Sequence, residues 1–186
     1  MKIDTPLTDA LIEKLHAGDR LTIRGTVYTA RDAAHKRLVR ALENDEPLPF
    51  DPTGQVIYYM GPSPARPGRP IGSAGPTTAC RMDPYTPPLL RAGLKGMIGK
   101  GARSVAVREA LQRHRAVYFA AIGGAAALIA DRIAKAQLVA YEDLGAEAIR
   151  RLWVEEFPVL VVNDIYGEDM YQLGQQKYRM TTAGSE

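Results

Sequence analysis

The sequence contains one cysteine, Cys80, among its 186 residues. A single thiol excludes a disulfide within this chain and any metal site that needs several cysteines from it. A long uncharged apolar run is also missing, because the most apolar stretch, 117–130, is too short to span a bilayer and contains Gly123 and Gly124. No leader with a charged start and an apolar centre is found either. From these absences we expect a cytoplasmic protein with no membrane segment and no metal site of its own.

A strong excess of one charge is lacking too. The chain has 24 Lys and Arg residues against 21 Asp and Glu residues, which gives a formal net charge of +3 at pH 7. Acidic residues are interleaved with the cations nearly everywhere, so we expect no nucleic-acid surface and only a weak preference for anionic ligands. No internal repeat or domain boundary is visible. We expect one domain over 1–171, followed by a polar tail over 172–186 that is frayed or held by a partner.

Strand-like and helix-like segments alternate along the chain. Apolar and β-branched segments predict strands at 20–29 with a bend at Gly25, and at 55–60, 93–99, 117–122, 149–155 and 158–162. Amphipathic or alanine-rich patterns predict a short helix capped by Thr8, a surface helix at 103–115, and helices at 30–44, 84–92 and 125–136. A proline-rich exposed loop is expected at 61–70. This alternation favours an α/β layered domain with partly parallel strands.

A glycine-proline turn in the centre of the chain presents two hydroxyl groups. Gly75 permits backbone angles that other residues avoid, and Pro76 fixes the next φ angle, so Thr77 and Thr78 follow a stiff turn. Their hydroxyl and backbone N–H groups are then available to one ligand. The alternative is that both hydroxyls only tie down the turn through bonds to the backbone.

Two cations accompany these hydroxyl groups. Arg81 follows the turn, and Lys100 stands between Gly99 and Gly101 at the end of a predicted strand. Arg binds carboxylates or phosphates in a bidentate manner and Lys acts as a point charge, so the group suits a small anion. Alternatively, Arg81 pairs with Asp83 and Lys100 is solvated. The Gly-Lys-Gly sequence lacks the spacing of a phosphate-binding P-loop.

A second charged group lies where the strand at 20–29 meets the helix that follows it. Arg31 and Asp32 stand at this junction, a usual position of binding residues in open α/β folds. Alternatively, Arg31 and Asp32 form only a local ion pair and place a charge at the N-terminus of the helix. His35 follows Arg31 by four residues and so shares its helix face, although a structural role is the other interpretation. Cys80 is either a packing residue or a thiol made reactive by the neighbouring arginine.

Five motifs in a fixed order resemble a known family. They are YTARDAAHKR at 28–37, VIYYMGP at 56–62, GPTTACRMD at 75–83, IGKG at 98–101 and GGAAA at 123–127. The chain from about 5 to 171 resembles the β subunit of two-subunit class I fumarate hydratases, which is equivalent to the C-terminal domain of the single-chain enzymes. It is also similar to the β subunit of L(+)-tartrate dehydratases.

The resemblance implies a three-layer β/β/α swivelling domain and a hydro-lyase site completed by an α subunit. That partner carries a 4Fe–4S cluster, and the implied assembly is a hetero-oligomer of two α and two β subunits. By resemblance, Arg31, Arg81 and Lys100 match the cations that hold the dicarboxylate substrate, and Thr77 matches the proton carrier. We further expect Thr78 to contact the substrate. Four residues are expected to support the site: Asp32, His35, Gly75 and Gly101. Cys80 departs from the small residue that the family usually has.

Three functions are therefore considered. The first is a hydro-lyase subunit that hydrates fumarate to (S)-malate reversibly, active only with the α subunit. The second is dehydration of L-tartrate or a related hydroxy-dicarboxylate, which the surroundings of Arg31 and Arg81 favour less. The third is a non-catalytic anion-binding or assembly module, against which the joint presence of Thr77, Arg81 and Lys100 counts.

Overall fold

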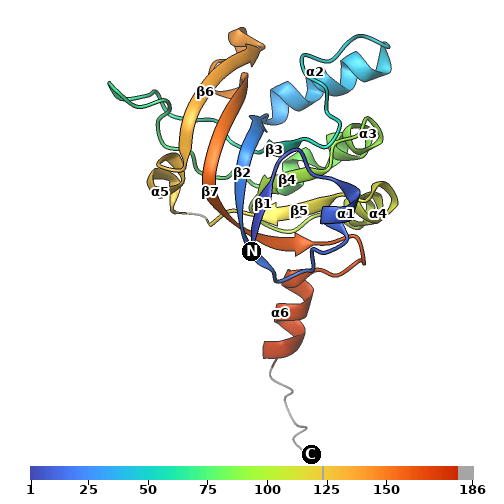
Figure 1. The fold of residues 1–186 in the computed structure, drawn as a ribbon. Coiled ribbons are helices and arrows are strands. Elements are labelled where there is room, and N and C mark those ends of the chain that lie inside the picture. The colour runs from blue at the N-terminus through green and yellow to red at the C-terminus, as the bar shows by residue number, and fades with distance from the viewer. Residues whose placement is uncertain (123, 180–186) are drawn as a thin grey trace, which may run out of the picture.

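Seven strands form one mixed sheet in the computed structural model, which describes residues 1–122 and 124–179 (Figure 1). The strands are β1 (Lys2–Asp4), β2 (Arg20–Thr29), β3 (Val56–Tyr58), β4 (Gly96–Gly99), β5 (Val117–Ala120), β6 (Ile133–Ala140) and β7 (Ile149–Asn163). Their order is β1-β2-β3-β4-β5-β7-β6. The mixed α/β class expected from the alternation is confirmed.

The strands β1 to β5 are parallel to their neighbours, whereas β7 runs antiparallel to β2, β5 and β6. Since β7 pairs with both β2 and β5, the strands β2, β3, β4, β5 and β7 form a closed circuit of pairings. The bend expected at Gly25 is present, because the register between β2 and β7 shifts between Ile23 and Gly25. The carboxyl ends of β2 to β5 therefore meet at one edge of the sheet.

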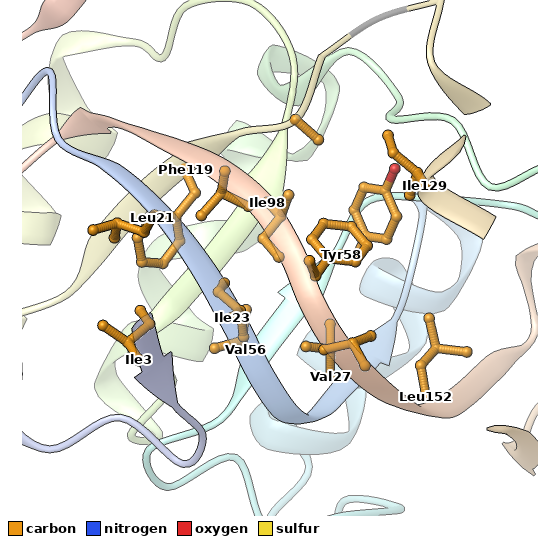
Figure 2. Packing of buried hydrophobic residues seen from close by; sticks show 14 of the residues in the cluster. Ile3, Leu21, Ile23, Val27, Val56, Tyr58, Ile98, Phe119, Ile129 and Leu152 are labelled. Atoms are coloured by element: carbon orange, nitrogen blue, oxygen red, sulfur yellow. The ribbon is translucent and has the colours of Figure 1, made fainter. Parts of the chain in front are cut away.

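Alternation along the short central strands creates two hydrophobic clusters. Val56 and Tyr58 of β3 belong to one cluster, whereas Ile57 and the following Tyr59 belong to the other. The first cluster lies among the strands themselves (Figure 2) and includes Phe157 of β7. The second lies between the sheet and its helices. Burial of both faces explains why β3 to β5 are nearly continuous apolar runs.

The helices gather mainly on one side of the sheet, opposite β6 (Figure 1). They are α1 (Asp9–Ile12), α2 (Asp32–Glu43), α3 (Thr86–Arg91), α4 (Val105–His114), α5 (Ala126–Ala130) and α6 (Met170–Tyr178), with 3₁₀ helices η1 (Ala79–Tyr85) and η2 (Glu142–Glu147). Thr8 caps α1 as predicted, because its hydroxyl accepts a hydrogen bond from the N–H of Leu11. The predicted helix at 84–92 is shorter, because Pro84 still belongs to η1.

The helix predicted at 125–136 is wrong beyond its first turns. The helix α5 ends at Ala130, and β6 begins at Ile133 and pairs with β7. This edge strand is rich in alanine and exposes Lys135 and Gln137, so its sequence favours a helix as much as a strand. Pairing with the long strand β7 overrides the local helix propensity of alanine.

A further expectation about the second half of the chain needs correction. The predicted strands at 149–155 and 158–162 are one strand, β7, in which Glu156 takes a left-handed φ of 50°. Pro158 does not end the strand, because its side chain is exposed and the chain continues past it. The tail expected from 172 begins within α6, and residues 180–186 lie outside the described part of the chain. No helix among the described residues is long and apolar enough to cross a membrane.

Candidate active site

The candidate residues gather at the edge where the parallel strands end. Arg31 follows β2 and precedes the first residue of α2, and Lys100 directly follows β4. Between them, Tyr59 follows β3 and receives the backbone N–H of Thr77 on its carbonyl oxygen at 2.7 Å. The carboxyl edge of parallel strands is the usual location of ligand sites in open α/β sheets.

The backbones of the threonine turn and the Lys100 loop are joined. The N–H of Lys100 donates to the carbonyl oxygen of Thr77 at 3.2 Å, and the N–H of Ala79 donates to the carbonyl oxygen of Lys100 at 2.8 Å. Thr78 and Lys100 thus form a parallel bridge. The structure brings Thr77, Thr78 and Lys100 together, and the side chain of Lys100 is exposed.

Arg31 and Arg81 are brought together by the carboxylate of Asp32. Arg81 Nε donates to Asp32 Oδ1 at 2.9 Å, and Arg81 Nη2 lies 2.8 Å from Asp32 Oδ2. Arg31 Nε lies 3.9 Å from the same Oδ2, whereas its Nη2 lies 3.4 Å from Glu147 Oε1. The alternative pairing of Arg81 with Asp83 is wrong. The local pair between Arg31 and Asp32 exists, but only as a long contact.

Glu147 was missed by the sequence analysis. One of its oxygens contacts Arg31, and the other accepts the N–H of Ala33 at 2.9 Å in the first turn of α2. It comes from η2, which is more than a hundred residues away in sequence. No local pattern marks such a carboxylate, so only the fold reveals it.

His35 lies fully buried beneath the charged edge. Its Nδ1 is 2.9 Å from the carbonyl oxygen of Arg31, so Nδ1 carries the proton and donates it to this bond. The ring meets that of Tyr59 edge to face at 5.2 Å between centroids. Burial lowers the pKa of His35 to about 4. A neutral His35 therefore holds the backbone of Arg31, and its side chain does not face solvent.

Arg103 and Asp83 were also missed as site components. Arg103 was expected in a surface helix, but α4 begins at Val105 and the side chain of Arg103 is 0% exposed. It forms an ion pair with Asp83, with 2.7 Å between Nε and Oδ1. Burial alone lowers the pKa of Arg103, but Tyr59 and Asp83 outweigh this and raise it. The spacing of basic residues in the sequence gave no signal for burial.

The two supporting glycines act differently from each other. Gly101 has a φ of 83°, in the left-handed region that favours glycine. Gly75 is absent from the described glycines with positive φ, so the conformational reason expected for it is wrong. A Cβ atom at Gly75 would instead lie 3.1 Å from the Cβ of Ala126. Gly75 thus allows the turn to pack closely against α5.

The described residues do not fit an iron–sulfur cluster. Clusters of this type are held mainly by several cysteine thiolates, and the chain has one cysteine, Cys80, which is exposed. Within 1–122 and 124–179, no group of three or more His, Cys, Asp or Glu side chains is arranged to hold a metal ion. Any cluster at this site requires ligands from outside the described residues.

Comparison with known proteins identifies relatives of this chain. A family model described as "Fumarase C-terminus" matches residues 1–174. The chain is 38% identical to fumarate hydratase 1, mitochondrial, of Leishmania major, over 92% of this chain and 32% of that protein. It is 37% identical to the aerobic class I fumarate hydratase of Escherichia coli K12, over 91% of this chain and 32% of the relative.

A third relative has a length close to that of this chain. It is a Methanocaldococcus jannaschii protein provisionally named L(+)-tartrate dehydratase subunit beta, 33% identical over 89% of this chain and 88% of the relative. By contrast, the chain spans about a third of the length of the fumarate hydratases that it matches.

Proposed function

Because the chain belongs to the family described as Fumarase C-terminus, we propose that it supplies the substrate-binding half of a hydro-lyase site. The reaction is the reversible hydration of fumarate to (S)-malate. Two contacts at the carboxyl edge of one sheet carry the proposal. Asp32 joins Arg31 to Arg81, and a backbone hydrogen bond joins Lys100 to Thr77. A dicarboxylate is the anion that such an arrangement of cations suits.

The charge distribution has a chemical consequence. Removal of a proton from the carbon beside a carboxylate increases the negative charge on that carboxylate. Arg31, Arg81 and Lys100 stabilise this larger charge more strongly than they stabilise the bound substrate, and such differential binding lowers the barrier. Arg81 is held by Asp32 and Arg31 by Glu147, so both guanidinium groups are oriented before substrate arrives.

Thr77 is proposed as the proton carrier, with Thr78 as a further substrate contact. A threonine hydroxyl is a poor base in water, so it requires a neighbouring cation that lowers its pKa. Lys100 is our candidate for that cation, because its backbone is hydrogen-bonded to that of Thr77. His35, Gly75 and Gly101 do not contact the substrate in this proposal. His35 fixes the backbone of Arg31, and the two glycines fix the threonine turn and the Lys100 loop.

The rest of the site is proposed to come from a partner. This chain lacks a ligand set for a 4Fe–4S cluster among its described residues, so we assign the cluster to an α subunit or an equivalent domain. The hetero-oligomer of two α and two β subunits and the cytoplasmic location stay predictions, as do the domain limits 1–171 and 172–186. The two hydrophobic clusters, one among strands and one under helices, support a three-layer β/β/α swivelling domain.

Dehydration of L-tartrate is the second candidate. It is favoured by the match to the provisionally named tartrate dehydratase subunit, which covers 88% of that protein, whereas the fumarate hydratases are covered to about a third. Both reactions remove or add water next to a carboxylate, so the same cations serve either. The two reactions are therefore distinguished by which substrate is turned over.

The test is an assay of the chain co-expressed with its cluster-bearing partner and reconstituted without oxygen. Turnover of fumarate and malate supports the first function, and turnover of L-tartrate alone supports the second. Thr77→Val preserves the shape of the side chain and removes the hydroxyl, so we expect turnover to fall by about a hundredfold or more. A fully active Thr77→Val complex rules out the proposed proton carrier, and an inactive wild-type complex rules out both reactions.

A further inference from the structure

The guanidinium group of Arg103 lies inside the protein, three residues after Lys100. Its Nε donates to Asp83 Oδ1 at 2.7 Å, and its Nη2 donates to the hydroxyl of Thr86 at 2.6 Å. Its Nη1 donates to the hydroxyl of Tyr59 at 3.3 Å. Each of the three guanidinium nitrogens therefore has a protein partner.

Two aromatic rings enclose the same group. The guanidinium carbon lies 5.5 Å from the centroid of Tyr59 and 5.0 Å from that of Tyr118. Tyr118 also donates its hydroxyl hydrogen to the carbonyl oxygen of Gly101 at 2.9 Å. Arg103 is thus fixed from β3, from β5 and from the helices, and the loop that begins at Lys100 is fixed with it.

Asp83, which forms the ion pair with Arg103, connects this loop to the segment that carries the other site residues. It belongs to η1, two residues after Arg81, and its second oxygen accepts the N–H of Ser104 at 2.7 Å. The segments 77–85 and 100–104 are therefore joined twice. The backbone bridge of Thr78 with Lys100 is one connection, and the carboxylate of Asp83 is the other.

A buried ion pair of this kind adds little to the stability of a protein. The cost of removing both charges from water is large, and well-packed apolar side chains often serve stability as well or better. A guanidinium with three oriented hydrogen bonds does provide something that an apolar side chain lacks, which is a fixed geometry between the groups it joins.

We propose that Arg103 is a positioning residue, which acts through Asp83 to fix Lys100 relative to Thr77 and Arg81. It touches no substrate. Its effect on the reaction rests on the proposed function, but its effect on the two segments does not. The competing explanation is a general contribution to folding, which would weaken all parts of the structure alike.

Hydrogen exchange on the full chain separates these explanations. The test variant is Asp83→Asn with Arg103→Met, which removes both charges and keeps an unbranched side chain between the rings. The control is Asp9→Asn with Lys95→Met, which removes both charges of a more exposed ion pair. Lys95 Nζ lies 2.8 Å from Asp9 Oδ1, and Lys95 precedes β4, at the opposite end of the strand from Lys100.

We expect the protection of the Lys100 and Ala79 amides, which form the bridge, to fall by about tenfold or more in the test variant. Amides that pair β2 with β7 should keep their protection, and the control should leave the bridge unchanged. Undiminished protection at the bridge overturns the proposal. An equal loss across the whole sheet overturns it as well.

Activity with the partner provides a second test. A small displacement of catalytic groups lowers rates strongly, so we expect the test variant to lower kcat/KM by about 10- to 100-fold. The same two substitutions added to Lys100→Ala should lower kcat/KM by less than about threefold further, because the cation that they position is already missing. An equal factor in both backgrounds contradicts positioning. If the wild-type complex turns over neither fumarate nor tartrate, the proposed function fails, and the exchange experiment alone decides the role of Arg103.

Discussion

Asp32 places a negative charge between two arginines that are proposed to bind a dianion. It lies within 2.9 Å of Arg81 and contacts Arg31 at 3.9 Å. A carboxylate that holds a guanidinium in place removes part of the entropic cost of substrate binding, at the expense of partly neutralising the charge. The positive charge of the site therefore depends on Lys100 and on both arginines together.

Arg81→Ala should separate function from stability. The side chain of Arg81 is 47% exposed, so loss of its ion pair should change the free energy of unfolding by less than about 1 kcal/mol. Loss of a substrate cation should lower kcat/KM by about 30-fold or more, equivalent to about 2 kcal/mol of transition-state stabilisation. Urea unfolding and steady-state kinetics of the reconstituted complex measure the two effects.

Arg37→Ala is the matched control for that variant. Arg37 pairs with Asp143 through two nitrogens and is 41% exposed, so it resembles Arg81 in partner and exposure. It has no proposed contact with substrate, and its kcat/KM should match that of the wild type. Similar kinetic losses in both variants would show that the effect of Arg81 is not one of substrate binding.

His35 should make stability depend on pH. Its pKa is about 4 in the folded protein and about 6.5 when unfolded, so the unfolded chain binds the proton more readily. The contribution is fully present above pH 6.5, declines as the pH falls towards 4, and amounts to about 3 kcal/mol at most.

Urea unfolding of the wild type and of His35→Asn between pH 7.5 and pH 4.5 tests this expectation, because asparagine keeps a donor for the carbonyl of Arg31 but does not titrate. The carboxylates titrate in both proteins, so the difference between the two curves isolates His35. Parallel curves would mean that burial does not lower the pKa of His35 in the folded protein.

At the scale of elements, the site depends on how closely β4 approaches the threonine turn. A Cβ atom at Gly99 would lie 2.9 Å from Tyr59 Cδ2 and 3.3 Å from the carbonyl oxygen of Thr77. At Gly101 the nearest atom, Thr78 Cγ2, would be 3.9 Å away, but φ is +83°. The first glycine is thus required by space and the second by backbone conformation.

Gly99→Ala should therefore displace the threonine turn, whereas Gly101→Ala should only strain its own residue. We expect Gly99→Ala to cost about 1–3 kcal/mol of unfolding free energy and to lower kcat/KM by about tenfold or more. Gly101→Ala should cost about 1–2 kcal/mol with a smaller kinetic effect. Urea unfolding and kinetics compare the pair, and a larger kinetic loss at Gly101 would contradict the steric argument.

The elements also show which parts of the fold could be predicted from the sequence. The apolar runs at β3, β4 and β5 predicted strands because both of their faces are buried. The alanine-rich β6 was assigned to a helix because its state depends on pairing with β7, which local propensity does not contain. The same holds within the site. Arg31, Arg81 and Lys100 could be proposed from ordered motifs, whereas the contact of Glu147 and the buried state of Arg103 depend on segments distant in sequence.

At the scale of the whole molecule, the chain is proposed to supply one half of a reaction centre. Its cations lie at an exposed edge, and its single cysteine is also exposed. The curated fumarate hydratases are about three times as long as the segment that matches this chain. The remaining length of those relatives is sufficient for a further domain, and we propose that such a domain or a separate subunit covers the edge and supplies the metal ligands.

The chain alone should therefore neither take up an iron–sulfur cluster nor hydrate fumarate. After anaerobic incubation with iron and sulfide, we expect no visible charge-transfer absorption, because one thiolate is too few for a stable cluster. Cys80→Ser should behave like the wild type in this assay and should keep its activity in the complex with the partner. Cluster absorption by the isolated wild-type chain that is lost in Cys80→Ser would assign metal binding to this chain, and turnover by the isolated chain would contradict the need for a partner. The division of the site between two polypeptides would then be wrong, because the cations and the cluster would reside in one.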